Sequence, residues 1–540
     1  MGRTPLFRFT VRALQRARQL NLEAAGQPAA VQRPGYRVSR RQFLKSGATA
    51  AAAAGLATTT GGGLVSARAM DPPRIAIVGG GLAGLNAALW LQDLRIDATV
   101  YEARDRVGGR CYSRKLVHDN TEYVLDYGGS FINSDHADML ALIDRYELRD
   151  ELFDRVEDAD DQPYQAEAYY FDGKLIPEAT FATDLQAIAE QISRDAALLD
   201  QNWSKWASRF DALSVADYLD QHADKLTAPG TREVLEQANR SEYGSEPRDS
   251  SALQLLFLLP VADGEHVEIL GYSDEKYVLE GGIGRLPDAM AAELGDRVQL
   301  GRVLTRVEDR MSTYMLTFAD GEVVEVDAVI VTVPASLLRT IEWTVTLPSQ
   351  FRRYIRDIDL GRNEKTFVGF TPRIWRTQQV WTNGMWVDGS PLPGPDKNTN
   401  GYCVAWEATQ REGPDAPSGA VTFYFGGAQV QKNRTSVRDL ARSLYTIIPG
   451  DADDDTHNGF SAATDWANEE FTRGAYINFK PGQLTTYGQY FWIENELSVA
   501  FRNLVFAGEH FSDLWYGFMN GGAETGRLAA NYVANRLPPG

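Results

Sequence analysis

The feature that most constrains the fold is a glycine-rich turn between a short apolar strand and a helix, close to residue 80. The strand pattern is "IAIV" (75–78), and the residues with helical spacing read "LNAALWLQD". Between them, Gly79, Gly81 and Gly84 form the pattern G-x-G-x-x-G. In such a turn the first glycine permits a sharp bend, the second lets the backbone approach a pyrophosphate, and the third lets the helix pack against the strand. The helix N-terminus then faces the phosphate charge.

An acidic residue follows at the end of the next strand. "ATVYE" is a second strand pattern, and it ends in Glu102. A carboxylate at this distance from the glycines accepts hydrogen bonds from ribose hydroxyls and would repel a 2′-phosphate. The order strand, turn, helix, strand and acid therefore predicts a Rossmann-like domain that binds a dinucleotide.

A second glycine turn lies just downstream and reads "RVGGR" (106–110). Its two guanidinium groups, from Arg106 and Arg110, suit the same pyrophosphate. Together with Glu102 this turn gives E-x-x-x-R-x-G-G-R, which resembles the FAD-binding signature of the flavin amine oxidase superfamily. That superfamily includes monoamine, polyamine and L-amino-acid oxidases. An NAD-dependent dehydrogenase would not explain the second turn.

The resemblance continues in the same order along residues 74–535. "LDYGGSFI" (125–132) is similar to the family's D-x-G-G strand, and "LEGGIGRLPDAMAAEL" (279–294) is similar to its G-G-x-x-x-L turn and helix. The stretch "FAGEHFSDLWYGFMNGGAETGRLAA" (506–530) completes the series. This collinear order is more specific than any single motif.

The resemblance implies an α/β fold with a Rossmann-like FAD-binding domain and an interleaved α+β substrate-binding domain. The chain is expected to alternate between the two domains after an N-terminal signal region. The expected segments are the signal region (1–69), three FAD-binding segments (70–133, 271–340 and 499–540), a helical first part of the substrate domain (134–270) and its second part (341–498).

The resemblance also indicates which residues hold FAD. The carboxylate of Glu509 is expected to bind a ribityl or ribose hydroxyl, and His510 to be a neighbour of the cofactor rather than a general base. A helix from about Gly521 is expected to direct backbone N–H groups at the reduced flavin and stabilise its negative charge. The expected cofactor-binding residues are Gly79, Gly81, Leu82, Ala83, Gly84, Glu102, Arg104, Gly109, Arg110, Gly128, Gly129, Val303, Gly508, Glu509, Phe518 and Met519.

Three residues are expected to serve catalysis. Tyr476 in "RGAYINF" and Phe518 in "WYGFMNG" match the two walls of the family's aromatic cage around the amine nitrogen; a packed core is the competing explanation for each. Lys365 in "LGRNEKTFVGF" is expected just before a strand. It matches a lysine that, in the family, binds a water beside the flavin and speeds the reaction with oxygen; a solvent-facing lysine is the competing explanation.

The substrate class stays open between amines and amino acids. An L-amino-acid oxidase commonly pairs the substrate carboxylate with an arginine soon after the D-x-G-G strand, and "GGSFINSDHADM" contains none. This favours a primary or secondary amine without a carboxylate. L-amino-acid oxidase remains the alternative, because the helical insertions hold arginines such as Arg240 and Arg353 that cannot be ranked.

The expected reaction is oxidation of the amine to an imine, with O2 reduced to H2O2. Desaturases and protoporphyrinogen oxidases share the N-terminal glycine pattern. They would not be expected to show the combination of residues found here at Lys365, Tyr476 and Phe518. The FAD is expected to be non-covalent, because residues 474–476 read "GAY" where some relatives carry the cysteine that attaches it. No metal is expected, because the six histidines lack ligand spacing.

The N-terminal region predicts export of the folded protein by the twin-arginine (Tat) machinery. "SRRQFLK" (39–45) is a twin-arginine signature, and the small-residue stretch after it ends in Ala67-x-Ala69, a cleavage pattern. Residues 1–69 are therefore not expected to be part of the folded body. Within them, "FRFTVRALQRARQL" is expected to be a plain extended n-region of the signal, with a helix at a membrane surface as the alternative. The expected location is periplasmic or extracellular.

The charge of the chain limits its partners. The net formal charge is −19, which disfavours binding to nucleic acid and mildly favours cationic ligands. The expected partners are a small-molecule amine or amino acid, O2 and the export machinery, with no nucleic acid. A homodimer is left open.

Overall fold

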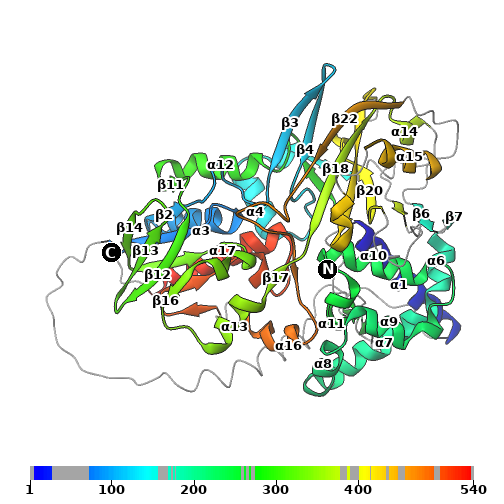
Figure 1. The fold of residues 1–540 in the computed structure, drawn as a ribbon, viewed down its shortest axis with the longest axis horizontal. Helices are drawn as coiled ribbons and strands as arrows, with labels where there is room; N and C mark the ends of the chain where they lie inside the picture. The colour runs from blue at the N-terminus through cyan, green and yellow to red at the C-terminus, as the bar shows by residue number, and fades with distance from the viewer. Residues whose placement is uncertain are drawn as a thin grey trace. The chain divides into compact units, whose positions relative to one another are not determined.

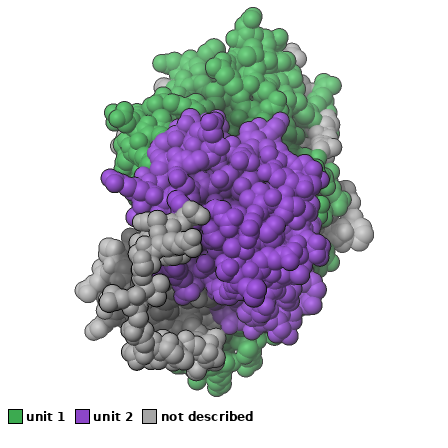
Figure 2. All heavy atoms as spheres, turned by 90° about the vertical axis from the view of Figure 1, so that its left-hand side faces the viewer, with its two compact units in different colours: residues 1–36, 111–285, 359–485 green, residues 37–110, 286–358, 486–540 purple. Residues whose placement is uncertain are grey.

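The structure, a computed structural model, describes residues 5–26, 72–155, 168–171, 174–176, 178–256, 261–262, 267–268, 274–377, 386–388, 401–413, 415–432, 437–447, 456–491 and 499–536. The chain divides into two compact units, shown in different colours in Figure 2. Each unit is assembled from separate stretches of the chain. Unit 1 comprises residues 1–36, 111–285 and 359–485, and unit 2 comprises residues 37–110, 286–358 and 486–540. The domain limits expected from the sequence remain predictions.

Unit 2 contains a six-stranded sheet in which every neighbouring pair is parallel except the last. Its two central strands are fully buried and read "IAIV" and "AVIV". Such continuous apolar runs are typical of parallel sheets covered on both faces. In sheet order the strands are β11 (Val298–Gln299), β2 (Ala98–Tyr101), β1 (Ile75–Val78), β15 (Ala328–Val331), β25 (Leu504–Phe506) and β24 (Ala500–Phe501).

Two helices from opposite ends of the unit 2 sequence pack side by side, α3 (Leu82–Asp93) and α17 (Met519–Ala534) (Figure 1). The Asn86 side chain donates a hydrogen bond of 2.7 Å to the carbonyl of Ala523, which fixes the two helices in register. The remaining long elements of this part are α12 (Arg285–Leu294), α13 (Ser349–Asp357) and a second sheet of β14 (Val323–Val326), β13 (Thr313–Phe318), β12 (Leu304–Arg310) and β16 (Glu342–Thr344).

Unit 1 contains a seven-stranded, mainly antiparallel sheet. Its strands β18 and β21 are buried along their whole length, so both faces of the sheet are covered. One face packs on an apolar core that includes Phe370, Trp375 and Phe423. In sheet order the strands are β22 (His457–Ala463), β18 (Asn363–Phe370), β21 (Gly419–Gly426), β20 (Val404–Glu407), β19 (Trp386–Asp388), β6 (Ala168–Phe171) and β7 (Lys174–Ile176).

A hairpin and several helices complete unit 1. The hairpin pairs β3 (Ser113–His118) with β4 (Thr121–Asp126). Short antiparallel pairs join β5 (Leu152–Asp154) to β10 (Tyr277–Leu279), β8 (Val261–Ala262) to β9 (Val267–Glu268), and β17 (Asp359–Leu360) to β23 (Ile477–Asn478). The helices are α1 (Pro5–Ala24), α4 (Ala137–Arg145), α6 (Glu178–Asp184), α7 (Gln186–Gln201), α8 (Trp203–Asp211), α9 (Val215–Gln221), α10 (Thr231–Tyr243), α11 (Ala252–Leu256), α14 (Ile374–Thr377) and α15 (Val437–Ile447); α16 (Gln483–Tyr487) runs across the boundary with unit 2.

Helix α1 corrects the expectation that residues 1–69 lie outside the folded body. It contacts α6, α7 and α10 (Figure 1), and Ala13, Leu14 and Ala17 on one of its faces are almost fully buried. The side chains of Asn21 and Gln186 also bond α1 to the start of α7. The apolar residues of α1 recur at helical spacing, so the helix is amphipathic and buries one face against the helices of unit 1. The twin-arginine stretch and the predicted cleavage site lie outside the described residues.

None of the helices in the described ranges combines the length and the hydropathy that a membrane span requires.

Candidate active site

The first glycine turn of unit 2 is shaped by close contacts at two glycines and by open space at the third. A Cβ atom added to Gly79, whose φ is +110°, would lie 2.6 Å from the Thr332 hydroxyl. One added to Gly84 would lie 1.9 Å from the carbonyl oxygen of Gly79. At Gly81 it would meet no atom within 4 Å. The first and third glycines therefore permit the packing of strand against helix, and the second faces space through which a phosphate could approach.

The second glycine turn lies against the first. Gly108 donates its N–H to the carbonyl of Gly80 at 2.8 Å and forms a parallel bridge with Gly81. Gly109 is the next residue, and its Cβ position faces Gly81 at 3.5 Å. Leu82, Ala83 and Gly84 form the first turn of α3, whose leading N–H groups have no partner within the helix. The two turns and these N–H groups fit the pyrophosphate of a dinucleotide.

Glu102 is 4% exposed and is held by backbone donors. Its carboxylate accepts N–H hydrogen bonds from Gly80 at 2.5 Å and from Arg104 at 2.9 Å, and the Arg104 guanidinium lies 3.6 Å away. A carboxylate offers about four acceptor sites, so two ribose hydroxyls could still donate to it. Val303 is half-buried, and its carbonyl accepts the N–H of Ala319 at 2.9 Å.

Glu509 joins the first and last stretches of unit 2. It is 6% exposed, it forms an ion pair of 2.8 Å with Arg110, and its second oxygen accepts the N–H of Gly517 at 2.6 Å. Gly508, just before it, donates to the Thr525 hydroxyl of α17. Both oxygens of Glu509 thus have a protein partner, so a flavin hydroxyl would share this carboxylate with Arg110.

The neighbouring His510 is fully buried, and burial lowers its pKa to about 4. Its ring is therefore neutral at physiological pH. Among the described residues neither ring nitrogen has a hydrogen-bond partner. These properties agree with a neighbour of the cofactor and provide no relay for a general base.

Helix α17 begins at Met519, two residues before the start expected from the Gly521–Gly522 pair. Phe518 adopts extended backbone geometry and is the residue that precedes the first turn. Its ring is 9% exposed and lies edge-on to Trp515, with ring centroids 5.9 Å apart. The difference arises because the residues before the glycines also accept helical geometry, and glycine is not required to begin a helix.

Lys365 lies inside β18, not before a strand as expected, because the strand begins at Asn363. Its side chain is buried, and burial lowers its pKa to about 8. The ammonium donates to the carbonyls of Asp126 at 2.9 Å and Gly128 at 2.7 Å and to the Ser130 hydroxyl at 2.8 Å. An ammonium has three donors, so all are used. Lys365 is therefore hydrogen-bonded to two residues of the D-x-G-G motif. Gly129, the last residue of that motif, follows Gly128 directly.

Tyr476 belongs to a group of aromatic residues that the sequence did not reveal. The Tyr424 hydroxyl donates to the Tyr476 hydroxyl at 3.0 Å, and Tyr424 faces Lys365 across the β18–β21 pair. Trp406 lies 5.4 Å from Tyr424, between ring centroids, and 5.8 Å from the Lys365 ammonium. We call Tyr424, Tyr476 and Trp406 the aromatic group. Alternation in "TFYF" and "VAW" predicts which residues share a face, but the register between strands is visible only in the structure.

The two cage residues belong to different units, Tyr476 to unit 1 and Phe518 to unit 2. The expected pairing of their rings therefore stays a prediction. The roles that the family resemblance implies for the other site residues also stay predictions.

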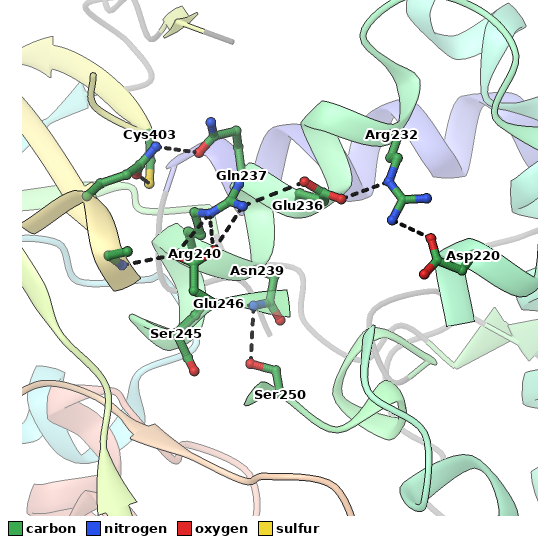
Figure 3. A network of polar contacts seen from close by, with 12 residues as sticks. Asp220, Arg232, Glu236, Gln237, Asn239, Arg240, Ser245, Glu246, Ser250 and Cys403 are labelled. Atoms are coloured by element: carbon green, nitrogen blue, oxygen red, sulfur yellow. Dashed lines mark hydrogen bonds and ion pairs between the residues drawn. The ribbon is translucent and has the colours of Figure 1, made fainter. Parts of the chain in front are cut away.

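Arg240, one of the unranked arginines, is committed to a buried network (Figure 3). It is 2% exposed, and its guanidinium forms ion pairs of 3.1 Å with Glu246 and 3.6 Å with Glu236. In the same network the Cys403 thiol donates to Gln429 at 2.7 Å. Arg240 thus neutralises buried carboxylates of its own unit, which disfavours it as a clamp for a substrate. Arg353 is exposed on α13.

Comparison with known proteins extends the similarity to most of the chain. A model of the flavin containing amine oxidoreductase family matches residues 82–534. Among curated proteins, amine oxidase [flavin-containing] A of Sus scrofa is 24% identical over 482 residues, which is 86% of this chain and 85% of that protein. Amine oxidase [flavin-containing] B of Homo sapiens is 25% identical over 486 residues, which is 86% of each chain.

Solved structures show the same fold. Putrescine oxidase bound to putrescine matches with a TM-score of 0.67 at 21% identity, and cyclohexylamine oxidase from Brevibacterium oxydans IH-35A matches with a TM-score of 0.69 at 20% identity. Each alignment covers 86% of this chain and 99% of the other. These matches confirm the predicted α/β fold with a Rossmann-like domain. The chain therefore belongs to the flavin-containing amine oxidoreductase family, as an FAD-dependent oxidoreductase that acts on amines.

Proposed function

We propose that this chain oxidises a carbon–nitrogen bond of a primary or secondary amine to an imine, while O2 is reduced to H2O2. The observation that carries this proposal is the setting of Lys365, a buried ammonium bonded to the D-x-G-G motif and close to Trp406 and Tyr424. The chemistry that FAD supplies when bound is acceptance of a hydride from the carbon next to the amine nitrogen. The imine then hydrolyses in water to a carbonyl compound and ammonia or an amine.

The residues of the chain hold and orient the reactants. Gly81 leaves room for the pyrophosphate, and the first turn of α3 supplies N–H donors to it. The ring of Tyr476 is fixed through its hydroxyl by Tyr424, so it offers a rigid wall for an amine. Positioning of this kind is the main contribution that a protein makes to a reaction whose electrons pass to a cofactor.

We assign to Lys365 the role of assisting the reaction with O2. With a pKa of about 8 it is mostly protonated at pH 7, and a cation stabilises the negative charge that develops on oxygen as it is reduced. Its three donors are already used, so a new contact with water or oxygen requires one partner to be released. Ser130 is the most easily released, because its hydroxyl can rotate to another partner.

The test is peroxide release from the purified, FAD-loaded protein across a panel of amines and amino acids, with catalase added as a control. We expect catalase-sensitive peroxide with at least one amine, together with oxygen uptake in equal amount. If none of these compounds bleaches the flavin in the absence of oxygen, the proposal is refuted.

L-amino-acid oxidase activity is the second candidate. It is favoured by a buried guanidinium, that of Arg411, which lines a cavity close to Lys365. The panel separates the two candidates, because an L-amino-acid oxidase yields a 2-oxo acid and ammonia.

We also propose that the twin-arginine stretch at residues 39–45 directs export of the folded, FAD-loaded protein. The support is the motif itself and the small-residue stretch after it. Replacing Arg40 and Arg41 by lysine in the producing cell should retain the protein in the cytoplasm. Unchanged export of this variant would refute the proposal.

A further inference from the structure

The short segment that carries Tyr476 is buried on both sides of the tyrosine. Residues 474–475 and 477–479 are buried, whereas Tyr476 itself is half-buried. We call residues 474–479 the wall segment. Its first half is fixed by Gly361, which donates its N–H to the Tyr476 carbonyl at 2.6 Å and accepts the N–H of Ala475 at 2.8 Å. The position of the ring therefore also depends on what holds the buried residues that follow it.

The buried asparagine of β23 has every hydrogen-bonding group of its side chain engaged. Asn478 is 5% exposed. Its Oδ1 atom accepts hydrogen bonds of 3.0 Å from the Ser250 hydroxyl and 3.0 Å from the Gln254 amide. Its Nδ2 group donates to the Ser245 hydroxyl at 3.2 Å and to the Asp249 carbonyl at 2.9 Å. A side-chain amide accepts two hydrogen bonds and donates two, so these four bonds use its full capacity.

The partners of Asn478 are themselves fixed. They all belong to residues 245–254, which follow helix α10. Ser250 is fully buried and accepts a hydrogen bond of 3.1 Å from Asn239 of α10 (Figure 3). Gln254 also binds the backbone of the next strand residue, donating to the Phe479 carbonyl at 3.2 Å and accepting the Phe479 N–H at 3.3 Å. A fully satisfied buried network of this kind favours a single arrangement of the groups that it joins.

The end of α10 approaches the wall segment closely through backbone atoms. A Cβ atom added to Gly361 would lie 1.9 Å from the Tyr243 carbonyl oxygen. One added to Gly244 would lie 2.8 Å from the Ala475 carbonyl oxygen. These contacts leave no room for side chains, so the wall segment and the end of α10 form one closely packed junction.

We propose that Asn478 is a positioning residue for amine oxidation, which holds the wall segment so that the Tyr476 ring lies in one place. The Tyr424 hydroxyl fixes only the tip of that ring, whereas Asn478 fixes the backbone that carries it. The inference rests on the proposed oxidase function, because the position of the ring affects the reaction only if the ring contacts the amine. A misplacement of about 1 Å can slow a positioned reaction by about 10²-fold.

The first test follows the anaerobic reduction of FAD by the amine that releases most peroxide. In Asn478→Ala its limiting rate should fall by about tenfold or more, because the ring is no longer held in place. Reoxidation by O2 should change by less than about twofold, since Lys365 keeps its partners. Ser245→Ala removes one of the four bonds at a half-buried position, so it should slow reduction by a smaller factor and remains informative if Asn478→Ala does not fold. Reduction at the wild-type rate in both variants would overturn the proposal.

A double-mutant cycle decides whether Asn478 acts through Tyr476. In the Tyr476→Ala background, Asn478→Ala should change the reduction rate by less than about twofold, because the effects of two residues that act through one contact do not add. A purely structural asparagine would slow the reaction by the same factor in both backgrounds. That result would overturn the proposal.

Asn458→Ala is the matched control. Asn458 is a half-buried asparagine of the same unit, which donates to the Tyr123 hydroxyl at 2.8 Å and to the Thr371 hydroxyl at 3.1 Å, and accepts the Phe460 N–H at 3.1 Å. It lies on β22, beside the end of β18 that is remote from Gly361. Its loss should leave the reduction rate at the wild-type value. A loss of rate equal to that of Asn478→Ala would show a general effect of removing a bonded amide and would overturn the proposal.

A second readout does not depend on turnover. Tetramethylammonium is a cation that aromatic rings bind, and it has no nitrogen lone pair with which to form an imine. Its dissociation constant, measured from the change in flavin absorbance of the FAD-loaded protein, should rise by about tenfold or more in Asn478→Ala and in Tyr476→Ala. The double variant should show no further rise. Equal dissociation constants for the wild type and Asn478→Ala would overturn the proposal.

The two readouts separate failure of this inference from failure of the oxidase function. Tetramethylammonium binding that Asn478→Ala weakens, with no reduction of the flavin by any amine, would support the positioning role and refute the oxidase function. Reduction by amines at the same rate in the wild type, Asn478→Ala and Ser245→Ala would support the oxidase function and refute the positioning role.

Discussion

At the scale of single residues, Lys365 shows how burial changes a common surface residue into a reactive one. Its ammonium is held by two carbonyls and a hydroxyl, and desolvation lowers its pKa to about 8. Lowering the pKa of a lysine favours the neutral amine, so the charge is present below about pH 8 and is lost as the pH rises through that value.

The first prediction concerns the loss of this charge. In Lys365→Met the rate of flavin reoxidation by O2 should fall by about 10²–10³-fold, because one preorganised charge near developing negative charge is removed. Anaerobic reduction by substrate should change much less. Stopped-flow absorbance separates the two half-reactions. Reoxidation at the wild-type rate would exclude a role for Lys365 with oxygen.

The same charge predicts a pH dependence. The wild-type reoxidation rate should decrease as the pH rises through about 8, where Lys365 loses its proton. Lys365→Met is the control, because its slow reoxidation should not follow this titration. A wild-type rate that stays constant from pH 6 to pH 10 would contradict the assignment.

Two glycines of the first turn predict opposite consequences of adding a side chain. Gly81 has a φ of −80° and open space at its Cβ position, so Gly81→Val should leave the apoprotein as stable as the wild type but obstruct the pyrophosphate. The FAD affinity, measured by flavin fluorescence, should fall at least tenfold. Gly84→Ala should instead destabilise the apoprotein by about 1–3 kcal/mol, because its Cβ would lie 1.9 Å from the Gly79 carbonyl oxygen. If both variants change the stability of the apoprotein by the same amount, this prediction is wrong.

At the scale of elements, helix α1 has the largest consequence, since it precedes the predicted export signal and yet packs within unit 1. Cleavage after Ala69 would separate this helix from the chain and expose the surfaces of α6, α7 and α10 that it covers. The mature protein can retain α1 in two ways. Either the signal is not cleaved, or α1 stays bound to unit 1 after cleavage. N-terminal sequencing and intact mass of the exported protein distinguish these cases.

The stability of unit 1 should therefore depend on α1. Leu14 is fully buried, so Leu14→Ala should reduce the free energy of unfolding by about 2–5 kcal/mol, through lost apolar contact and the cavity that remains. Arg16→Ala is the control on the exposed face of the same helix and should change it by less than about 0.5 kcal/mol. Chemical denaturation followed by tryptophan fluorescence measures both. Equal stability of the Leu14→Ala variant and the control would show that α1 does not contribute to the folded unit.

At the scale of the whole molecule, the cofactor-binding motifs are spread over most of the chain, but the glycine turns, Glu102 and Glu509 all fall in unit 2. No cysteine occurs at residues 474–476, and both cysteines of the chain are buried and neither forms a disulfide. We therefore expect FAD to be held by non-covalent contacts alone. Acid precipitation of the native protein should release all yellow colour into the supernatant. Colour that stays with the precipitate after washing in denaturant would contradict this expectation.

Local patterns in the sequence determined the parts of this protein that depend on local physical chemistry. A strand, a glycine turn, a helix and an acid in close succession define the nucleotide turn, because each feature is set by residues a few positions apart. The fully apolar run of β1 predicted a strand for the same reason.

Only the tertiary structure decided which distant residues meet. It brought Tyr424 and Trp406 to the same face as Lys365, placed Arg411 against Asp126, and occupied Arg240 with the carboxylates of its own unit. A search for an arginine next to the D-x-G-G strand could not find Arg411, because strand register and loop packing are set by the whole sheet. The sequence thus determines the cofactor class through short-range geometry, whereas the pocket depends on long-range packing that no local pattern contains.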